Sequence, residues 1–151
     1  ITIVVSAGNE NANACESTPA YHESVITVGS TDKNDERSNF SNYGPCVDLY
    51  APGLDITSVG PIHGASDTMS GTSMSAPHAT GAAALIYGKA RTASPQSVKM
   101  MLLREASPGL VGHASVTASK NKFLYVGPKE QPNEGMIQPG MIQPGMIQPG
   151  M

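Results

Sequence analysis

The chain has 151 residues, of which 39% are hydrophobic and 14% charged, and its formal net charge is −3. A weakly acidic chain of this kind lacks the basic patch that binds nucleic acid or an anionic membrane surface. No apolar run comes near the roughly 20 residues that span a bilayer. Length and composition therefore predict one compact core and no membrane span.

The chain begins with a run suited to a buried strand. Residues 1–7 read Ile-Thr-Ile-Val-Val-Ser-Ala, and β-branched runs of this kind are typical of strands buried on both faces of a parallel sheet. Gly8 and Asn9 follow directly. Ligands of open α/β sheets gather at the carboxyl ends of strands, which makes Asn9 a candidate site residue. Taken alone, Gly-Asn is more often an ordinary turn.

Two more strand patterns follow along the chain. Residues 24–29 read Ser-Val-Ile-Thr-Val-Gly, and residues 47–53 read Val-Asp-Leu-Tyr-Ala-Pro-Gly, where Pro-Gly ends the strand. Between them, residues 40–44 read Phe-Ser-Asn-Tyr-Gly, a polar and aromatic turn. The three buried strands predict an α/β fold with a mainly parallel sheet.

The most specific segment is residues 71–78, which read Gly-Thr-Ser-Met-Ser-Ala-Pro-His and lead into a long uncharged run. The run predicts a helix over residues 73–89 whose low polarity is typical of the protein interior. Ser73 would then lie at the mouth of this helix, where the helix dipole and free backbone N–H groups favour a nucleophile. The simpler alternative is an ordinary helix cap, because Ser and Thr are favoured there.

The last third of the chain holds one more helix and a repetitive tail. Ser94 as a cap and Pro95 at the first helical position predict a helix over residues 94–106. From Lys129 the composition changes, and Met-Ile-Gln-Pro-Gly occurs three times in succession. A proline and a glycine in every five residues predict disorder over residues 129–151. The tail is either a spacer to another module or anchor, or an expanded repeat without a selected role.

Taken in this order, these motifs resemble the subtilisin-like serine proteases (peptidase S8 family), and most of all their proteinase K and aqualysin branch. The likeness extends over roughly residues 1–126. It implies a subtilisin-like three-layer α/β fold with a mainly parallel sheet and a buried central helix after the nucleophile serine. Residues 1–128 would be the C-terminal part of the peptidase domain, and residues 129–151 a low-complexity tail.

The resemblance also assigns roles to individual residues. Ser73 matches the nucleophile, and Asn9 matches the asparagine whose side chain completes the oxyanion hole. Ser6, Ala7 and Gly8 match one wall of the pocket for the side chain that precedes the scissile bond. The implied activity is endopeptidase cleavage of protein or peptide substrates through a Ser-His-Asp triad.

Two of the three triad residues have no counterpart in the sequence. The family places an aspartate motif and a His-Gly-Thr motif before the oxyanion asparagine, and neither occurs in this chain. His78 belongs to the Ala-Pro-His element, which is structural in the family. We therefore expect the chain to be part of a longer protease, with a missing N-terminal half and an inhibitory propeptide as partners, and to be inactive alone. The alternatives are a catalytically inactive subtilisin-fold binding module and a structural repeat protein.

The two cysteines predict a disulfide bond and not a metal site. Cys15 and Cys46 form no Cys-x-x-Cys pair, which argues against zinc, and the branch carries a disulfide at this spacing. Two free cysteines in a cytosolic protein are the alternative to a secreted, extracellular or vacuolar enzyme.

The resemblance also implies a structural calcium ion. In the proteinase K branch, an aspartate at the place of Asp48 binds Ca²⁺ together with backbone carbonyls from the positions of Glu23 and Val25. One carboxylate with carbonyl oxygens suits this hard cation. The alternative is that Asp48 only caps a turn.

Overall fold

The computed structural model describes residues 1–113 and 118–127. The tail predicted over residues 129–151 lies outside the described residues, and so does the domain boundary expected at residue 128. No helix in the part that is described has the length and apolar character to cross a bilayer.

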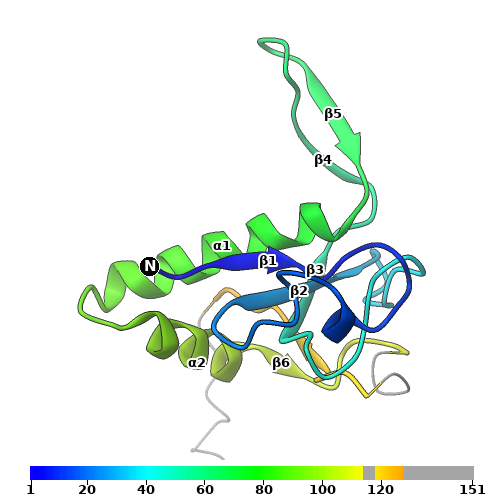
Figure 1. The fold of residues 1–151 in the computed structure, drawn as a ribbon. Coiled ribbons are helices and arrows are strands. Elements are labelled where there is room, and N and C mark those ends of the chain that lie inside the picture. Colours follow the sequence, from blue (N-terminus) through cyan, green and yellow to red (C-terminus); the bar gives the residue numbers. More distant parts are fainter. Residues whose placement is uncertain (114–117, 128–151) are drawn as a thin grey trace, which may run out of the picture.

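A five-stranded sheet forms the centre of the fold (Figure 1). In spatial order its strands are β1 (Val4–Ser6), β2 (Ile26–Thr31), β3 (Leu49–Pro52), β7 (Lys122–Phe123) and β6 (Ser107–Pro108). The first four run parallel to their neighbours, and β6 is antiparallel to β7. The expected α/β class with a mainly parallel sheet is confirmed.

Two helices cover one face of this sheet. They are α1 (Thr72–Lys89) and α2 (Pro95–Glu105), close to the predicted ranges, and the side chain of Ser94 caps α2 by accepting from the backbone N–H of Ser97. Because side chains alternate along a strand, Leu49 and Ala51 of β3 face the helices and join a core with Ala79 and Leu102.

The opposite face of the sheet is covered by loops and by a short 3₁₀ helix, η1 (Ala14–Glu16). Tyr50 points into this second core, together with Ala14 and Val47. Its hydroxyl donates to Oγ of Ser119 at 2.9 Å, and burial raises the pKa of Tyr50. Alternate residues of β3 therefore supply both cores.

The expected burial of the first strand and of the long helix is only partly observed. β1 lies at the edge of the sheet, Ile1 is fully exposed, and Ile3 is half exposed. On α1, the side chains of Leu85 and Tyr87 are also about half exposed. A groove of about 500 Å³ runs between the start of the chain and α1. Both β1 and α1 therefore carry apolar side chains that no other described residue covers.

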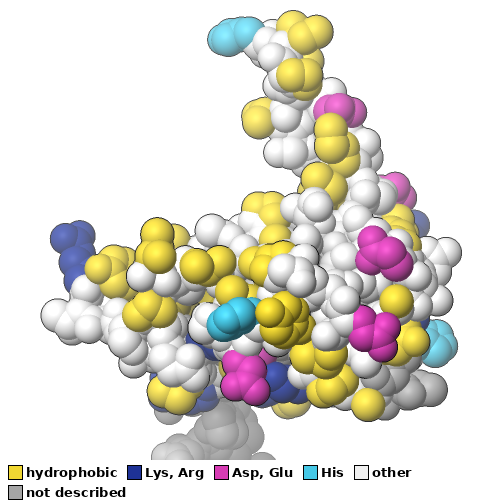
Figure 2. All heavy atoms as spheres, viewed as in Figure 1, with side chains coloured by type: hydrophobic (Ala, Val, Ile, Leu, Met, Phe, Trp, Pro, Cys, Tyr) yellow, Lys and Arg dark blue, Asp and Glu magenta, His cyan; other side chains and the backbone are white. Residues whose placement is uncertain are grey.

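A two-stranded hairpin projects from the body of the fold just before α1 (Figure 1). It consists of β4 (Ile56–Val59) and β5 (Ser66–Met69), paired antiparallel. Apolar side chains lie along it in Figure 2, and Val59, Ile62 and Met69 are exposed. The sequence does not predict this hairpin, because its strands are only four residues long and mostly polar, and glycine and proline lie in the loop between them.

The disulfide is present. Cys15 in η1 is bonded to Cys46 before β3, with an S–S distance of 2.10 Å and a Cα–Cα distance of 5.2 Å. It ties the loop that follows Asn9 to the segment that leads into β3. The pairing expected from the resemblance therefore occurs in the structure.

This bond generates a first prediction. Replacing both Cys15 and Cys46 by serine should lower the free energy of unfolding by about 3–4 kcal/mol, because the bond closes a loop of roughly thirty residues in the unfolded chain. Urea unfolding of the longer protease that we expect to contain this chain, in its oxidised form and as the double variant, measures the difference. Mass spectrometry of a non-reduced digest should show the two peptides linked, and free thiols on both residues would contradict the assignment.

Candidate active site

Ser73 lies in the first turn of α1, with its side chain exposed to solvent. Within the described residues, its hydroxyl takes part in no hydrogen bond. The first turn of a helix also leaves backbone N–H groups without helical partners. The N–H groups of Thr72 and Met74 are hydrogen-bonded, which leaves the N–H of Ser73 beside its own exposed hydroxyl, an arrangement that suits a serine nucleophile.

Asn9 reaches this turn from the carboxyl end of β1. Its Oδ1 accepts a hydrogen bond from the backbone N–H of Thr72 at 2.9 Å and another from the Thr72 hydroxyl at 2.8 Å. The same hydroxyl accepts from the backbone N–H of Gly8 at 3.2 Å. Because these contacts hold the oxygen of the Asn9 amide, they fix the direction in which its nitrogen donates.

That nitrogen and the backbone nitrogen of Ser73 face the same small space. A methyl group placed on Gly71 would lie 3.5 Å from Nδ2 of Asn9 and 3.7 Å from the backbone N of Ser73. The space exists because residue 71 is glycine and leaves it empty. Two N–H donors converging on one point can bind an oxygen that gains negative charge.

Asn42 holds the loop that carries Asn9. Its side chain is fully buried. Its Nδ2 donates to the carbonyl of Ala7 at 3.0 Å, and its Oδ1 accepts from the backbone N–H groups of Glu10 and Ala12 at 3.1 and 2.9 Å. Residues 40–44 were noticed only as a turn, so sequence reasoning missed the role of Asn42, as it missed that of Thr72.

The predicted pocket wall is one continuous segment just before Asn9. Ser6 ends β1, and Ala7 is buried with its N–H bonded to the carbonyl of Val28 at 2.9 Å. Gly8 has a φ of +103°, and a Cβ there would lie 2.3 Å from Nδ2 of Asn42. Glycine is therefore required at this position for two independent reasons. The role of the segment in substrate binding stays a prediction.

None of the four histidines makes a hydrogen bond to Ser73 in the described part of the chain. Nδ1 of His78 lies 2.8 Å from the carbonyl oxygen of Met74, one turn back on its own helix. His113 pairs with Glu36 at 2.7 Å, His22 contacts Ser24, and His63 lies in the loop between β4 and β5. The expectation that the catalytic base lies outside this chain stays a prediction.

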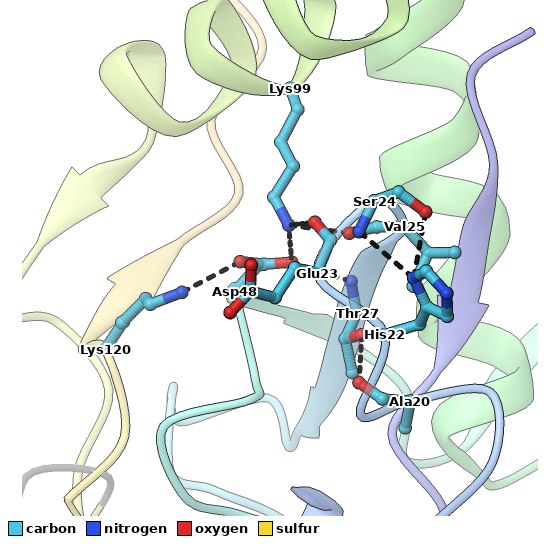
Figure 3. A network of polar contacts seen from close by, with 9 residues as sticks. All are labelled: Ala20, His22, Glu23, Ser24, Val25, Thr27, Asp48, Lys99 and Lys120. Atoms are coloured by element: carbon cyan, nitrogen blue, oxygen red, sulfur yellow. Dashed lines mark hydrogen bonds and ion pairs between the residues drawn. The ribbon is translucent and has the colours of Figure 1, made fainter.

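The three residues expected to bind calcium do come together, but around a side chain (Figure 3). Asp48 is only 3% exposed, and its Oδ2 lies 2.7 Å from Nζ of Lys99. The same nitrogen donates to the carbonyl oxygens of Glu23 and Val25 at 3.0 and 2.6 Å. A second ammonium, from Lys120, lies 3.0 Å from Oδ1 of Asp48. The ammonium of Lys99 thus lies at the point where the predicted ligands converge.

The contacts of Asn42 generate a second prediction. Asn42→Ala should lower the free energy of unfolding by about 3 kcal/mol, because several buried partners lose their hydrogen bonds at once. The exposed Asn39 is the matched control, and Asn39→Ala should change stability by less than about 0.5 kcal/mol. Urea unfolding of both variants, made in the longer protease that we expect to contain this chain, measures the effect. Equal midpoints for the two variants would show that Asn42 does not hold the loop.

Comparison with known proteins identifies the family to which this chain belongs. The Subtilase family profile matches residues 1–133. The chain is 48% identical over 126 residues to the extracellular serine proteinase of Thermus sp. (strain Rt41A), covering 83% of this chain and 30% of that protein. It is 43% identical over 125 residues to the alkaline serine exoprotease A of Vibrio alginolyticus, covering 83% of this chain and 23% of that protein.

A solved structure agrees. The crystal structure of a cold adapted subtilisin-like serine proteinase superposes with a TM-score of 0.80 at 42% identity, over 84% of this chain and 45% of that one. The chain thus spans less than a third of the length of the two relatives named above. With a family profile that matches most of its length, the chain belongs to the subtilase family of serine proteases.

Proposed function

We propose that this chain contributes the nucleophile and the oxyanion site of a subtilisin-like serine endopeptidase. The observation that carries the proposal is the position of two donor nitrogens, Nδ2 of Asn9 and the backbone N of Ser73, at 3.5 and 3.7 Å from the point where a Cβ on Gly71 would lie. A binding module that had lost catalysis would have no need to keep both donors aimed at one point beside an exposed serine.

The proposed reaction is acyl transfer. Oγ of Ser73 attacks the carbonyl carbon of a peptide bond while a base removes its proton, and the C–O bond forms as the carbonyl oxygen takes the negative charge. Asn9 and the Ser73 N–H donate to this oxygen. The C–N bond then breaks as the base gives its proton to the leaving amine, which leaves the acyl group bound to Oγ of Ser73 as an ester. Water attacks this ester while the base takes a proton from the water, and the bond to Oγ breaks as Oγ receives that proton. A histidine oriented by an aspartate, both outside these 151 residues, would be the base.

The uncovered apolar surface supports a partner for this half of the machinery. Ile1 and Ile3 on the edge strand, and Leu85 and Tyr87 on α1, would be covered by the polypeptide that carries the histidine and the aspartate. A strand added beside β1 would also pair its free edge. On this proposal the complete domain has a third layer, a substrate wall at Ser6–Gly8 and an inhibitory propeptide.

We propose that the protein is secreted. The disulfide between Cys15 and Cys46 is of a kind that persists in oxidising compartments. The Thermus relative is described as extracellular. Both observations favour an extracellular enzyme that acts on protein or peptide substrates.

In the complete protease, Ser73→Ala should abolish peptide hydrolysis, because the other two hydroxyls of that turn, on Thr72 and Ser75, are buried and already hydrogen-bonded. Asn9→Ala should lower kcat about 10²- to 10³-fold, a figure that comes from a subtilisin itself, and leave KM nearly unchanged. Steady-state kinetics on a chromogenic peptide measures both. A rise in KM with normal kcat would show that Asn9 binds substrate and does not stabilise the oxyanion.

Residues 1–128 expressed alone should neither hydrolyse peptides nor fold cooperatively. The apolar edge strand and the outer face of α1 would be left in water, which favours aggregation, and Ser73 would lack a base. Thermal unfolding and labelling with a fluorophosphonate probe test both expectations. A sharp transition together with rapid labelling of Ser73 would overturn the proposal that a second segment is required.

A further inference from the structure

The contacts around Asp48 point to a cation that is part of the chain. We infer that the ammonium of Lys99 takes the place of a calcium ion at Asp48, Glu23 and Val25. The inference is independent of the proposed catalytic role, because the cluster is built from α2 and from the segments before β2 and β3 and does not include the nucleophile.

The first argument is the match between donors and acceptors. A lysine ammonium has three N–H donors and no acceptor. Nζ of Lys99 meets three oxygens, from one carboxylate and two backbone carbonyls, at 2.7, 3.0 and 2.6 Å. Each donor therefore has one partner, and every oxygen that a calcium ion would use at this point is already bound.

The second argument is charge. Calcium affinity rises with the number of charged ligands, and Asp48 supplies the one carboxylate contact at Nζ of Lys99, because Glu23 contributes its backbone carbonyl. Lys99 and Lys120 already place two positive charges on it, at 2.7 and 3.0 Å. No group of three or more acidic, histidine or cysteine residues that could hold a metal occurs in the described ranges. A divalent ion would have to displace an ammonium and then compete with the other.

The third argument is position. Lys99 extends from α2, its side chain is 12% exposed, and the carboxylate that it reaches is 3% exposed (Figure 3). Breaking a buried pair of this kind leaves a charge without compensation. The lysine thus joins α2 to the start of the sheet, the structural task that a bound ion would otherwise perform.

The first test uses the unmodified complete protease and measures lysine acetylation by mass spectrometry, with and without calcium chloride. Lys99 should react about tenfold more slowly than the exposed Lys89 of α1, because acylation requires a nitrogen released from its hydrogen bonds. Calcium should not change the rate at Lys99. Equal rates at the two lysines, or faster labelling of Lys99 when calcium is added, would overturn the inference.

The second test counts bound ⁴⁵Ca²⁺ by equilibrium dialysis. Wild type, Asp48→Asn and the control Lys89→Ser should bind the same number of ions, because no calcium in the wild type depends on Asp48. The double variant Lys99→Ser, Lys120→Ser should bind one more, and adding Asp48→Asn should remove it. Loss of one ion in Asp48→Asn would contradict the inference, as would a folded double variant that gains none. Circular dichroism checks that each variant is folded.

Discussion

The geometry of the site depends on one buried side chain, the carboxamide of Asn42. It binds the carbonyl of Ala7 on one side of the loop after β1 and the N–H groups of Glu10 and Ala12 on the other. Both its donor and its acceptor are used in a place without water, where unpaired groups are costly. The loop between these contacts has little freedom left, and Asn9 lies at its centre.

From this anchored loop the remaining geometry follows through Thr72. Its backbone N–H and hydroxyl hold Oδ1 of Asn9, and its hydroxyl also receives the N–H of Gly8. The residue next to the serine therefore orients the amide that works with it. Two segments more than sixty residues apart in the chain become one unit because the helix and the loop share these bonds.

Local patterns predict the first three strands and both helices, because periodicity and caps act within one segment. The joint role of Asn9 and Ser73 rests on the family resemblance of their motifs and stays a prediction. The role of Lys99 could not be foreseen, since nothing near it distinguishes it from the exposed Lys89. The exposure of Ile1 and Ile3 in this chain has a related reason. An apolar run predicts that a strand will be buried, but it does not identify the segment of polypeptide that buries it. The strands β4 and β5 alternate too weakly between apolar and polar residues for the hairpin to be predicted from the sequence.

The ammonium at Asp48 has a thermodynamic consequence. A bound ion stabilises a fold by mass action, so its contribution falls when the ion is diluted or chelated. A tethered charge has no free concentration, and its contribution is the same in any medium that leaves the lysine and the carboxylate ionised. The link between α2 and the sheet is thus present as soon as the chain folds, with no ion to be collected from the surroundings.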